Sequence, residues 1–197
     1  MPTAKPKPSI YELKITLLEI KPAIWRRIQV PSTLLLCCLH DAIQIVMDWT
    51  DSHLHQFEKN GKYWGVPDDD GFDGDINVID ERRVPVAKVL LAEGDSMVYV
   101  YDFGDNWRHG VVLEKILPSD GTPPKPVCIA GERRCPPEDV GGPSGYQEFL
   151  EAIFEPGHEE FSHFRGWAGG KFHAEEFDLK TVNKALERMR WPVRHRR

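Results

Sequence analysis

The first part of the chain alternates apolar and polar residues in two neighbouring segments. The alternation runs over residues 11–17 and again over residues 24–30, with Lys21-Pro22-Ala23 between them. Successive side chains of a strand point to opposite faces of a sheet, so each segment predicts a strand with one buried face. The short connection between them predicts an antiparallel hairpin.

A helical period follows this hairpin. Pro31, Ser32 and Thr33 supply a helix start, with Ser32 or Thr33 as the expected N-cap. The helix itself is indicated by apolar residues at helical spacing: Leu36, Leu39, Ile43 and Val46. A broad apolar stripe of this kind predicts an amphipathic helix that lies on a sheet.

The chain then returns to strand-like patterns. Residues 53–58 alternate and predict a third strand, which ends at the turn signal Asn60-Gly61. Residues 65–80 are rich in Asp and Gly and predict a loop, and residues 84–91 predict a short helix or a buried connector.

A strongly apolar segment marks the middle of the predicted sheet. Residues 97–103 are apolar on both faces apart from Asp102, which predicts a central strand. Gly104-Asp105-Asn106 is a turn signal, and residues 107–117 then form the expected hairpin partner. The order of these elements predicts an α+β fold, specifically a β-grasp (ubiquitin-like) mixed sheet with one crossing helix.

The last third of the chain changes in composition. Residues 118–145 are dense in Pro and Gly and predict a long loop, after which residues 146–154 predict a helix. Asp178 is the expected N-cap of a final helix. We therefore expect three parts: a flexible N-terminus (1–9), a single α+β domain (10–190) and a basic tail (191–197).

Composition and charge narrow the possible functions. The chain has 197 residues, of which 41% are hydrophobic, and a net charge of −6. No apolar run approaches the ~20 residues of a membrane helix, and the N-terminus lacks the apolar core of a signal peptide, so we expect a cytoplasmic protein without membrane contact. Five arginines lie in residues 188–197, so the remaining chain is more acidic than the total. We expect no sequence-specific DNA binding, and the tail is either a phosphate contact or a solvated basic end.

The most unusual segment is the predicted hairpin at residues 99–109, which concentrates acidic, basic, imidazole and aromatic side chains. Two further imidazoles, spaced by two residues on the third strand, are expected to point the same way. Together these residues are candidates for binding a metal or a polar ligand: His53, His55, Tyr101, Asp102, Asp105, Trp107 and His109. In a purely structural alternative, Asp102 is partly buried and finds its partners within the hairpin, which are Arg108, His109 or the amides of the Gly104-Asp105-Asn106 turn.

Other metal signals are weaker. Cys128 and Cys135 could form half of a zinc site, but the other two ligands of a structural zinc are not evident. Residues 69–80 partly match a calcium loop, although Gly71 offers no side-chain oxygen at the third position. Glu138 and Asp139 precede glycines and a helix, and we expect them to accept hydrogen bonds from backbone amides and so pin the loop. The phosphate-binding, dinucleotide-binding and nucleophile-elbow motifs are absent from the sequence.

Four stretches together give the chain a recognisable pattern. They are Ile24-Trp25-Arg26-Arg27-Ile28; Trp49 with His53-Leu54-His55-Gln56-Phe57; Tyr101-Asp102-Phe103-Gly104-Asp105 with Trp107 and His109; and Cys135-Pro136-Pro137-Glu138-Asp139 with Gly141-Gly142-Pro143 and Gly145-Tyr146. In this combination the chain, over roughly residues 10–190, resembles the family named for the third open reading frame of a bacterial root-inducing plasmid.

The resemblance implies an association with mobile DNA, because some family members are labelled transposon resolvase-like. A serine recombinase needs a nucleophilic serine among arginines and a DNA-reading helical domain, and neither Ser9 nor Ser32 has such a setting. The family often carries a cysteine after its Glu-Asp pair, where this chain has Val140. That departure weakens a metal role for Cys128 and Cys135.

Two hypotheses of different classes follow. The first is a binding or adaptor module that presents Trp25, Tyr101, Trp107 and the histidines to a protein, peptide or small ligand, and the absence of standard catalytic motifs favours it. The second is a metal-dependent hydrolase or nucleic-acid-processing enzyme. It would use a divalent ion at the histidines with Asp102 or Asp105 to activate a water molecule.

Overall fold

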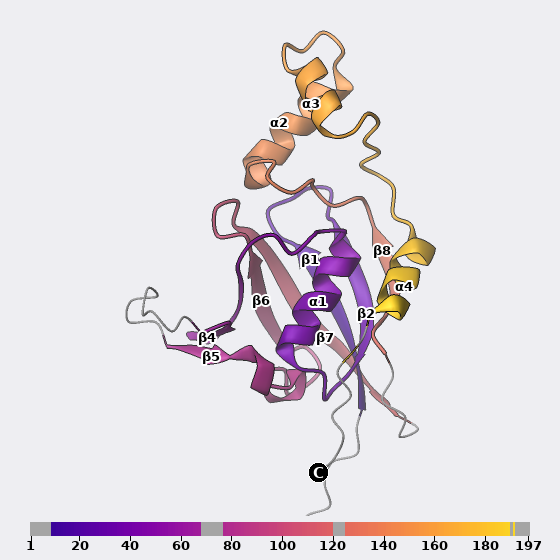
Figure 1. Ribbon diagram of the computed structural model, residues 1–197. Coiled ribbons are helices and arrows are strands. Elements are labelled where there is room, and N and C mark those ends of the chain that lie inside the picture. Colours follow the sequence, from indigo (N-terminus) through magenta and orange to yellow (C-terminus); the bar gives the residue numbers. More distant parts are fainter. Residues whose placement is uncertain (1–8, 68–76, 120–124, 190, 192–197) are drawn as a thin grey trace, which may run out of the picture.

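The fold consists of one large sheet with helices on one face and at one end (Figure 1). The computed structural model describes residues 9–67, 77–119, 125–189 and 191. Its strands are β1 (Ser9–Leu17), β2 (Trp25–Pro31), β3 (His55–Lys59), β4 (Lys62–Gly65), β5 (Val78–Asp80), β6 (Ser96–Tyr101), β7 (Trp107–Pro118) and β8 (Val127–Glu132). Its helices are α1 (Leu36–Met47), α2 (Gly142–Phe154), α3 (Phe161–Trp167) and α4 (Leu179–Arg188), with 3-10 turns at Glu81–Arg83 and Val86–Lys88. The α+β prediction is confirmed.

The eight strands follow the order β5-β4-β3-β6-β7-β1-β2-β8. The pairing of β4 with β5 is parallel, and the other pairings are antiparallel. The predicted hairpins β1–β2 and β6–β7 are both present, and β6 and β7 lie in the interior of the sheet as expected. Asn60 and Gly61 both have positive φ and form the turn between β3 and β4.

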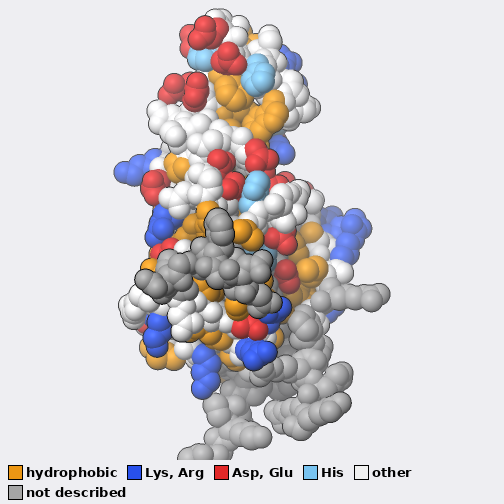
Figure 2. Space-filling model, turned by 60° about the vertical axis from the view of Figure 1, so that its left-hand side comes forward, with side chains coloured by type: hydrophobic (Ala, Val, Ile, Leu, Met, Phe, Trp, Pro, Cys, Tyr) orange, Lys and Arg blue, Asp and Glu red, His pale blue; other side chains and the backbone are white. Residues whose placement is uncertain are grey.

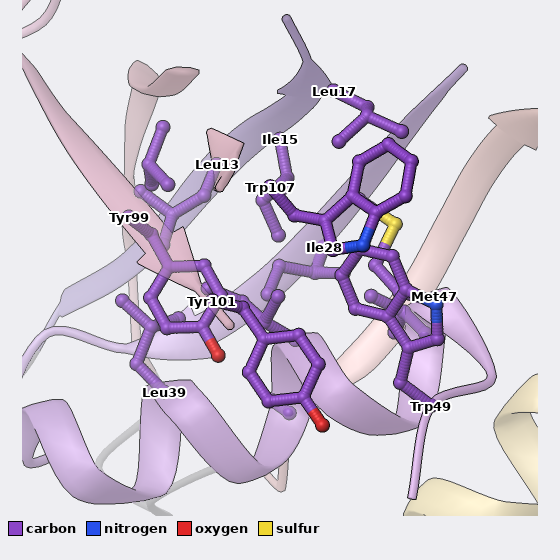
Figure 3. Close-up of a cluster of buried hydrophobic side chains, with 14 of the residues drawn as sticks. Leu13, Ile15, Leu17, Ile28, Leu39, Met47, Trp49, Tyr99, Tyr101 and Trp107 are labelled. Atoms are coloured by element: carbon purple, nitrogen blue, oxygen red, sulfur yellow. The ribbon is translucent and has the colours of Figure 1, made fainter. Parts of the chain in front are cut away.

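Helix α1 covers one face of the sheet and closes the core. Its buried side chains include Leu36, Leu39 and Ile43, which belong to the same apolar cluster as Leu13 and Ile15 of β1. At the C-terminal end of the helix the cluster becomes aromatic, with Trp49, Tyr101 and Trp107 close together (Figure 3). This aromatic layer fixes the end of the sheet where β6 turns into β7.

The opposite face of the sheet carries charged residues in pairs. Arg27 contacts Glu114, and its guanidinium also lies over the ring of Trp25. Arg108 pairs with Glu58 in the same way. The acids on this face therefore have basic partners. Trp25 does not lie at the β6–β7 turn, because its Nε1 donates to Glu132 at the β8 edge.

Four local predictions were wrong. The N-cap of α1 is Leu35 rather than Ser32 or Thr33, because Ser32 instead accepts a hydrogen bond from the backbone of Ser9. The Pro/Gly-rich segment contains strand β8, which gains regular structure by pairing with β2. Strand β5 lies within residues 65–80, which were predicted to form a loop. Helix α3 was not predicted. The expected cap at Asp178 is confirmed, since its carboxylate accepts from the amides of Lys180 and Thr181.

Some predictions fall outside the described residues. They concern residues 1–8, most of the acidic loop with its partial calcium motif, and residues 192–197 of the basic tail. Among the described residues, no helix is both long and apolar enough to cross a membrane.

Candidate functional site

Three loops meet where α1, the β6–β7 hairpin and α2 come together. They are residues 48–54 after α1, residues 102–106 between β6 and β7, and residues 133–141 before α2. Acidic side chains and an imidazole gather at this level of the surface, below the projecting helices α2 and α3 (Figure 2). The loops are far apart in sequence, so tertiary contacts must hold them in place.

Glu138 and Tyr101 form the central tie between these loops. The Tyr101 hydroxyl donates to Glu138 at 2.5 Å and accepts from the amide of Ser52 at 2.9 Å. Glu138 also accepts from the amide and the hydroxyl of Thr50. Burial alone would raise the pKa of Glu138, but the hydrogen bonds from Thr50 and Tyr101 outweigh it and lower that pKa. The prediction that Glu138 pins its loop is therefore confirmed.

Asp102 starts the β6–β7 turn. Its φ of 56° lies in the left-handed region, which Asp and Asn tolerate better than most residues. Its Oδ1 accepts from the amides of Gly104 at 2.9 Å and Asp105 at 3.3 Å. The residue is only 8% exposed, as expected for an acid that ends an apolar strand. Of the predicted partners, the turn amides are confirmed, whereas Arg108 pairs with Glu58 and His109 bonds to backbone carbonyls.

Asp105 joins the same turn to the loop before α2. Its Oδ2 accepts from the amide of Gly141 at 3.1 Å. Gly142 lies against the turn with a φ of 70°, and a Cβ at that position would come within 2.5 Å of the Asp105 carbonyl oxygen. Glycine is therefore required for this close approach.

His53, Asp102 and Asp139 bring one ring nitrogen and two carboxylates together. His53 Nε2 lies 3.0 Å from Asp139 Oδ1 and 3.7 Å from Asp102 Oδ2. The nitrogen is buried, yet it makes no hydrogen bond, because Asp139 Oδ1 does not lie along its N–H direction and Asp102 Oδ2 is beyond hydrogen-bonding distance. The three atoms lie within 4.8 Å of one another, a spacing that allows them to share a metal ion.

The carboxylates at this site have no Lys or Arg partner among the described residues. Asp102, Asp105, Glu138 and Asp139 form no ion pair with Lys or Arg in the described part of the chain, in contrast to the acids on the open face of the sheet. Two large apolar side chains beside the acids are exposed: Leu54 by 70% and Phe103 by 51%. The site therefore combines unbalanced negative charge with apolar surface.

A second polar group lies beneath α1, centred on two imidazoles. His40 and His55 stack with ring centroids 3.5 Å apart and planes that differ by 4°. His40 bonds to Tyr99 and Asp51, and His55 bonds to the buried Glu81. Burial, together with the neighbouring His55, lowers the pKa of His40 to about 3.

The predicted site residues do not form one group: some lie at the three loops, His55 lies in the second polar group, and others are buried. The expectation that His53 and His55 share a strand face is wrong, because β3 begins at His55 and His53 lies in the preceding loop. His109 and Trp107 are buried beneath the surface. His109 bonds through Nδ1 to the carbonyls of Tyr99 and Trp107, and burial lowers its pKa to about 4.

The two candidate zinc cysteines do not meet. Cys128 Sγ donates to the Ala130 carbonyl, whereas Cys135 Sγ contacts Arg26 and Met47. Burial raises the pKa of each thiol to about 11, although Arg26 opposes this shift in both. Within the described ranges, neither cysteine belongs to a group able to hold a metal ion.

The sequence did not indicate four residues of the loop site and of the His40–His55 group, and it suggested a different role for a fifth residue. His40, Thr50, Asp51 and Glu81 carried no motif, and their partners are distant in sequence. Asp139 was expected to accept from backbone amides but instead faces His53. Its position beside Glu138, just before two glycines, was the signal that could have placed it at the site.

The fold and the site together define an α+β protein with one mixed sheet and an acidic, histidine-containing site at one end of it. The chain belongs to the plasmid pRiA4b ORF-3-like protein family, which matches residues 9–181. It is 38% identical over 193 residues to the uncharacterized protein y4hQ of Sinorhizobium fredii (strain NBRC 101917 / NGR234), covering 96% of this chain and 97% of that protein.

A solved structure supports the same fold. The crystal structure of MM3350 from Methanosarcina mazei Go1, described as a protein of unknown function, matches with a TM-score of 0.79 and 40% sequence identity. The match covers 89% of this chain and 98% of that chain. The sheet and helices described above are thus an architecture that this chain shares with that protein of Methanosarcina mazei Go1.

Proposed function

We propose that the chain is a binding module whose ligand carries a positive charge next to an apolar group. The observation that carries the proposal is a set of four carboxylates that have no Lys or Arg partner within the residues that the structure describes: Asp102, Asp105, Glu138 and Asp139. A cationic group would balance this charge, and the exposed Leu54 and Phe103 would contact the apolar part.

The rigidity of the site supports binding by a preformed surface. The Tyr101–Glu138 tie and the Asp105–Gly141 hydrogen bond connect all three loops. Buried aromatic side chains, including Trp49 and Trp107, support the loops from below. A site that is already ordered loses less conformational entropy when its ligand binds.

The test uses short peptides that pair an arginine or lysine with a phenylalanine or leucine. They are titrated into isotope-labelled protein in the presence of a chelator and followed by NMR. We expect shifts at the amides of Leu54, Phe103 and Gly104, and weaker binding for Leu54→Ser and Asp105→Asn. Peptides that bind with equal affinity to both variants, or that shift only distant amides, would refute the proposal.

A metal-dependent hydrolase is the alternative, and the grouping of His53, Asp102 and Asp139 is the observation that favours it. An ion there would lower the pKa of a bound water molecule, and a neighbouring carboxylate would accept its proton. Turnover of phosphoester or peptide substrates that depends on an added ion and is lost in His53→Ala would favour the enzyme over the binding module.

The β-grasp topology, the single domain, the cytoplasmic location and the resolvase label stay predictions. The β-grasp assignment is supported by the first hairpin and the crossing helix α1, whereas the pairings among β6, β7 and β1 are all antiparallel. The single domain, the cytoplasmic location and the resolvase label are inferences from sequence. The unbalanced acids at the site would repel the phosphates of nucleic acid, which supports the expectation of no specific DNA binding there.

A further inference from the structure

We propose that His53 Nε2, Asp102 Oδ2 and Asp139 Oδ1 bind one divalent first-row transition-metal ion. This inference rests on the proposed function, because the three atoms belong to the proposed binding site. It adds that this part of the site binds a metal cation. The three residues come from three different loops, so the ion would lie where these loops meet.

The distances suit a shared ion. Metal–ligand bonds of about 2.0–2.2 Å place neighbouring donor atoms roughly 3–3.5 Å apart. His53 Nε2 lies 3.0 Å from Asp139 Oδ1 and 3.7 Å from Asp102 Oδ2, with all three atoms within 4.8 Å of one another. Small side-chain adjustments are sufficient to bring the three donors onto one ion.

The donor atoms themselves lack other partners. His53 Nε2 is buried without a hydrogen bond, although two carboxylate oxygens lie near it. The side chain of Asp102 is 12% exposed, and the turn amides occupy its Oδ1. Its Oδ2 faces the imidazole at 3.7 Å, beyond hydrogen-bonding distance. A buried ring nitrogen and a carboxylate oxygen that converge on one another without a hydrogen bond are groups that a metal ion would satisfy.

The second group of possible ligands, His40, Asp51 and His55, suits a metal less well. An ion bound by imidazole lies in the plane of the ring, along the nitrogen lone pair. The rings of His40 and His55 are stacked and nearly parallel, so their lone pairs do not converge. Both nitrogens of His40 are also hydrogen-bonded, to Tyr99 and Asp51.

The donor types indicate which ions fit. One imidazole with two carboxylates suits Mn²⁺, Fe²⁺ or Zn²⁺ better than Ca²⁺, which prefers oxygen ligands alone. Three protein ligands leave coordination positions open, and Asp139 is exposed to solvent. Water or a donor atom of an organic ligand can therefore complete the coordination.

The test is a titration of the full chain, purified without a histidine tag and freed of metal, with Mn²⁺. Free Mn²⁺ is measured by electron paramagnetic resonance, and Mn²⁺ is chosen because it binds the four thiols weakly. The variants are Asp139→Asn and His53→Ala. The matched control is Asp51→Asn, because Asp51 and Asp139 are both exposed, both have positive φ and both lie beside an imidazole.

We expect one ion per chain for the parent and for Asp51→Asn. We expect affinity at least about tenfold weaker for Asp139→Asn and His53→Ala, since loss of even a supporting group costs 10–100-fold. Circular dichroism checks that each variant is folded. Equal affinity in Asp139→Asn, loss of binding in Asp51→Asn, or no binding by the parent overturns the proposal.

The peptide titration with chelator separates this inference from the proposed function. Peptide binding without Mn²⁺ binding leaves the binding module in place and removes the metal site. Mn²⁺ binding without peptide binding removes the cationic organic ligand and leaves the metal site.

Discussion

Asp102 gives the most quantitative test of how the site is built. Replacing it with Ala removes the Oδ1 acceptor of the Gly104 and Asp105 amides. Each lost hydrogen bond costs roughly 0.5–1.5 kcal/mol, and the 3.3 Å bond to Asp105 lies at the lower end. Alanine at a φ of 56° adds about 1 kcal/mol of backbone strain. We therefore expect Asp102→Ala to lower the free energy of unfolding by about 2–3 kcal/mol.

Asp102→Asn separates the turn from the charge. The amide oxygen still accepts from the turn, and asparagine tolerates the left-handed backbone. Removing one of four neighbouring carboxylates also relieves repulsion in the metal-free protein. We expect a change within about 1 kcal/mol of the parent.

Urea denaturation, followed by both tryptophan fluorescence and far-UV circular dichroism, measures these differences, provided the two transitions coincide. If Asp102→Ala is as stable as the parent, the hydrogen bonds of Asp102 do not hold the turn. If Asp102→Asn is as damaging as Asp102→Ala, the charge rather than the acceptor geometry is what stabilises the fold. Either result would refute the reasoning above.

Three further predictions follow from the packing around the site. Gly142→Ala should lower the free energy of unfolding, measured in urea, by about 2 kcal/mol or more, because φ is positive and the added Cβ would clash with the Asp105 carbonyl. The control Gly157→Ala, which has open space around the added Cβ, should change it by less than about 0.5 kcal/mol. His109 should stay neutral by ¹⁵N NMR until the pH approaches its pKa of about 4. Because that pKa is depressed by burial, its contribution to stability is complete above pH ~6.5 and is lost as pH falls toward 4. Cys135 should react with a thiol reagent only at the rate of unfolding, because it is buried and its pKa is about 11, and rapid reaction in the native protein would contradict this packing.

The elements with strong local patterns could be predicted from the sequence. Alternation predicted β1 and β2, the apolar run with a single acid predicted the central strand β6, and the turn signal after it predicted the partner strand β7. Burial of one strand face produces alternation, and burial of both faces produces an apolar run. Both patterns can be recognised from consecutive residues alone. The partial burial of Asp102 followed from the same argument.

The site could be predicted only in part, because distant segments complete it. His53 and Asp102 were named from sequence, but the approach of Asp139 depends on the Tyr101–Glu138 tie between separate loops. Strand β8 was missed because the residues on both sides of it are rich in Pro and Gly, and its own apolar residues become regular structure by pairing with the distant β2. Trp107 and His109 were predicted to contact a ligand, but both are buried. The sequence of a strand does not show whether distant segments cover one of its faces.

A crystal structure of the protein grown with Mn²⁺ tests the central claim most directly. The claim predicts an anomalous difference peak among His53 Nε2, Asp102 Oδ2 and Asp139 Oδ1, about 2.0–2.3 Å from each atom. A peak between His40 and Asp51, or a saturated crystal with no peak at these three atoms, would contradict it.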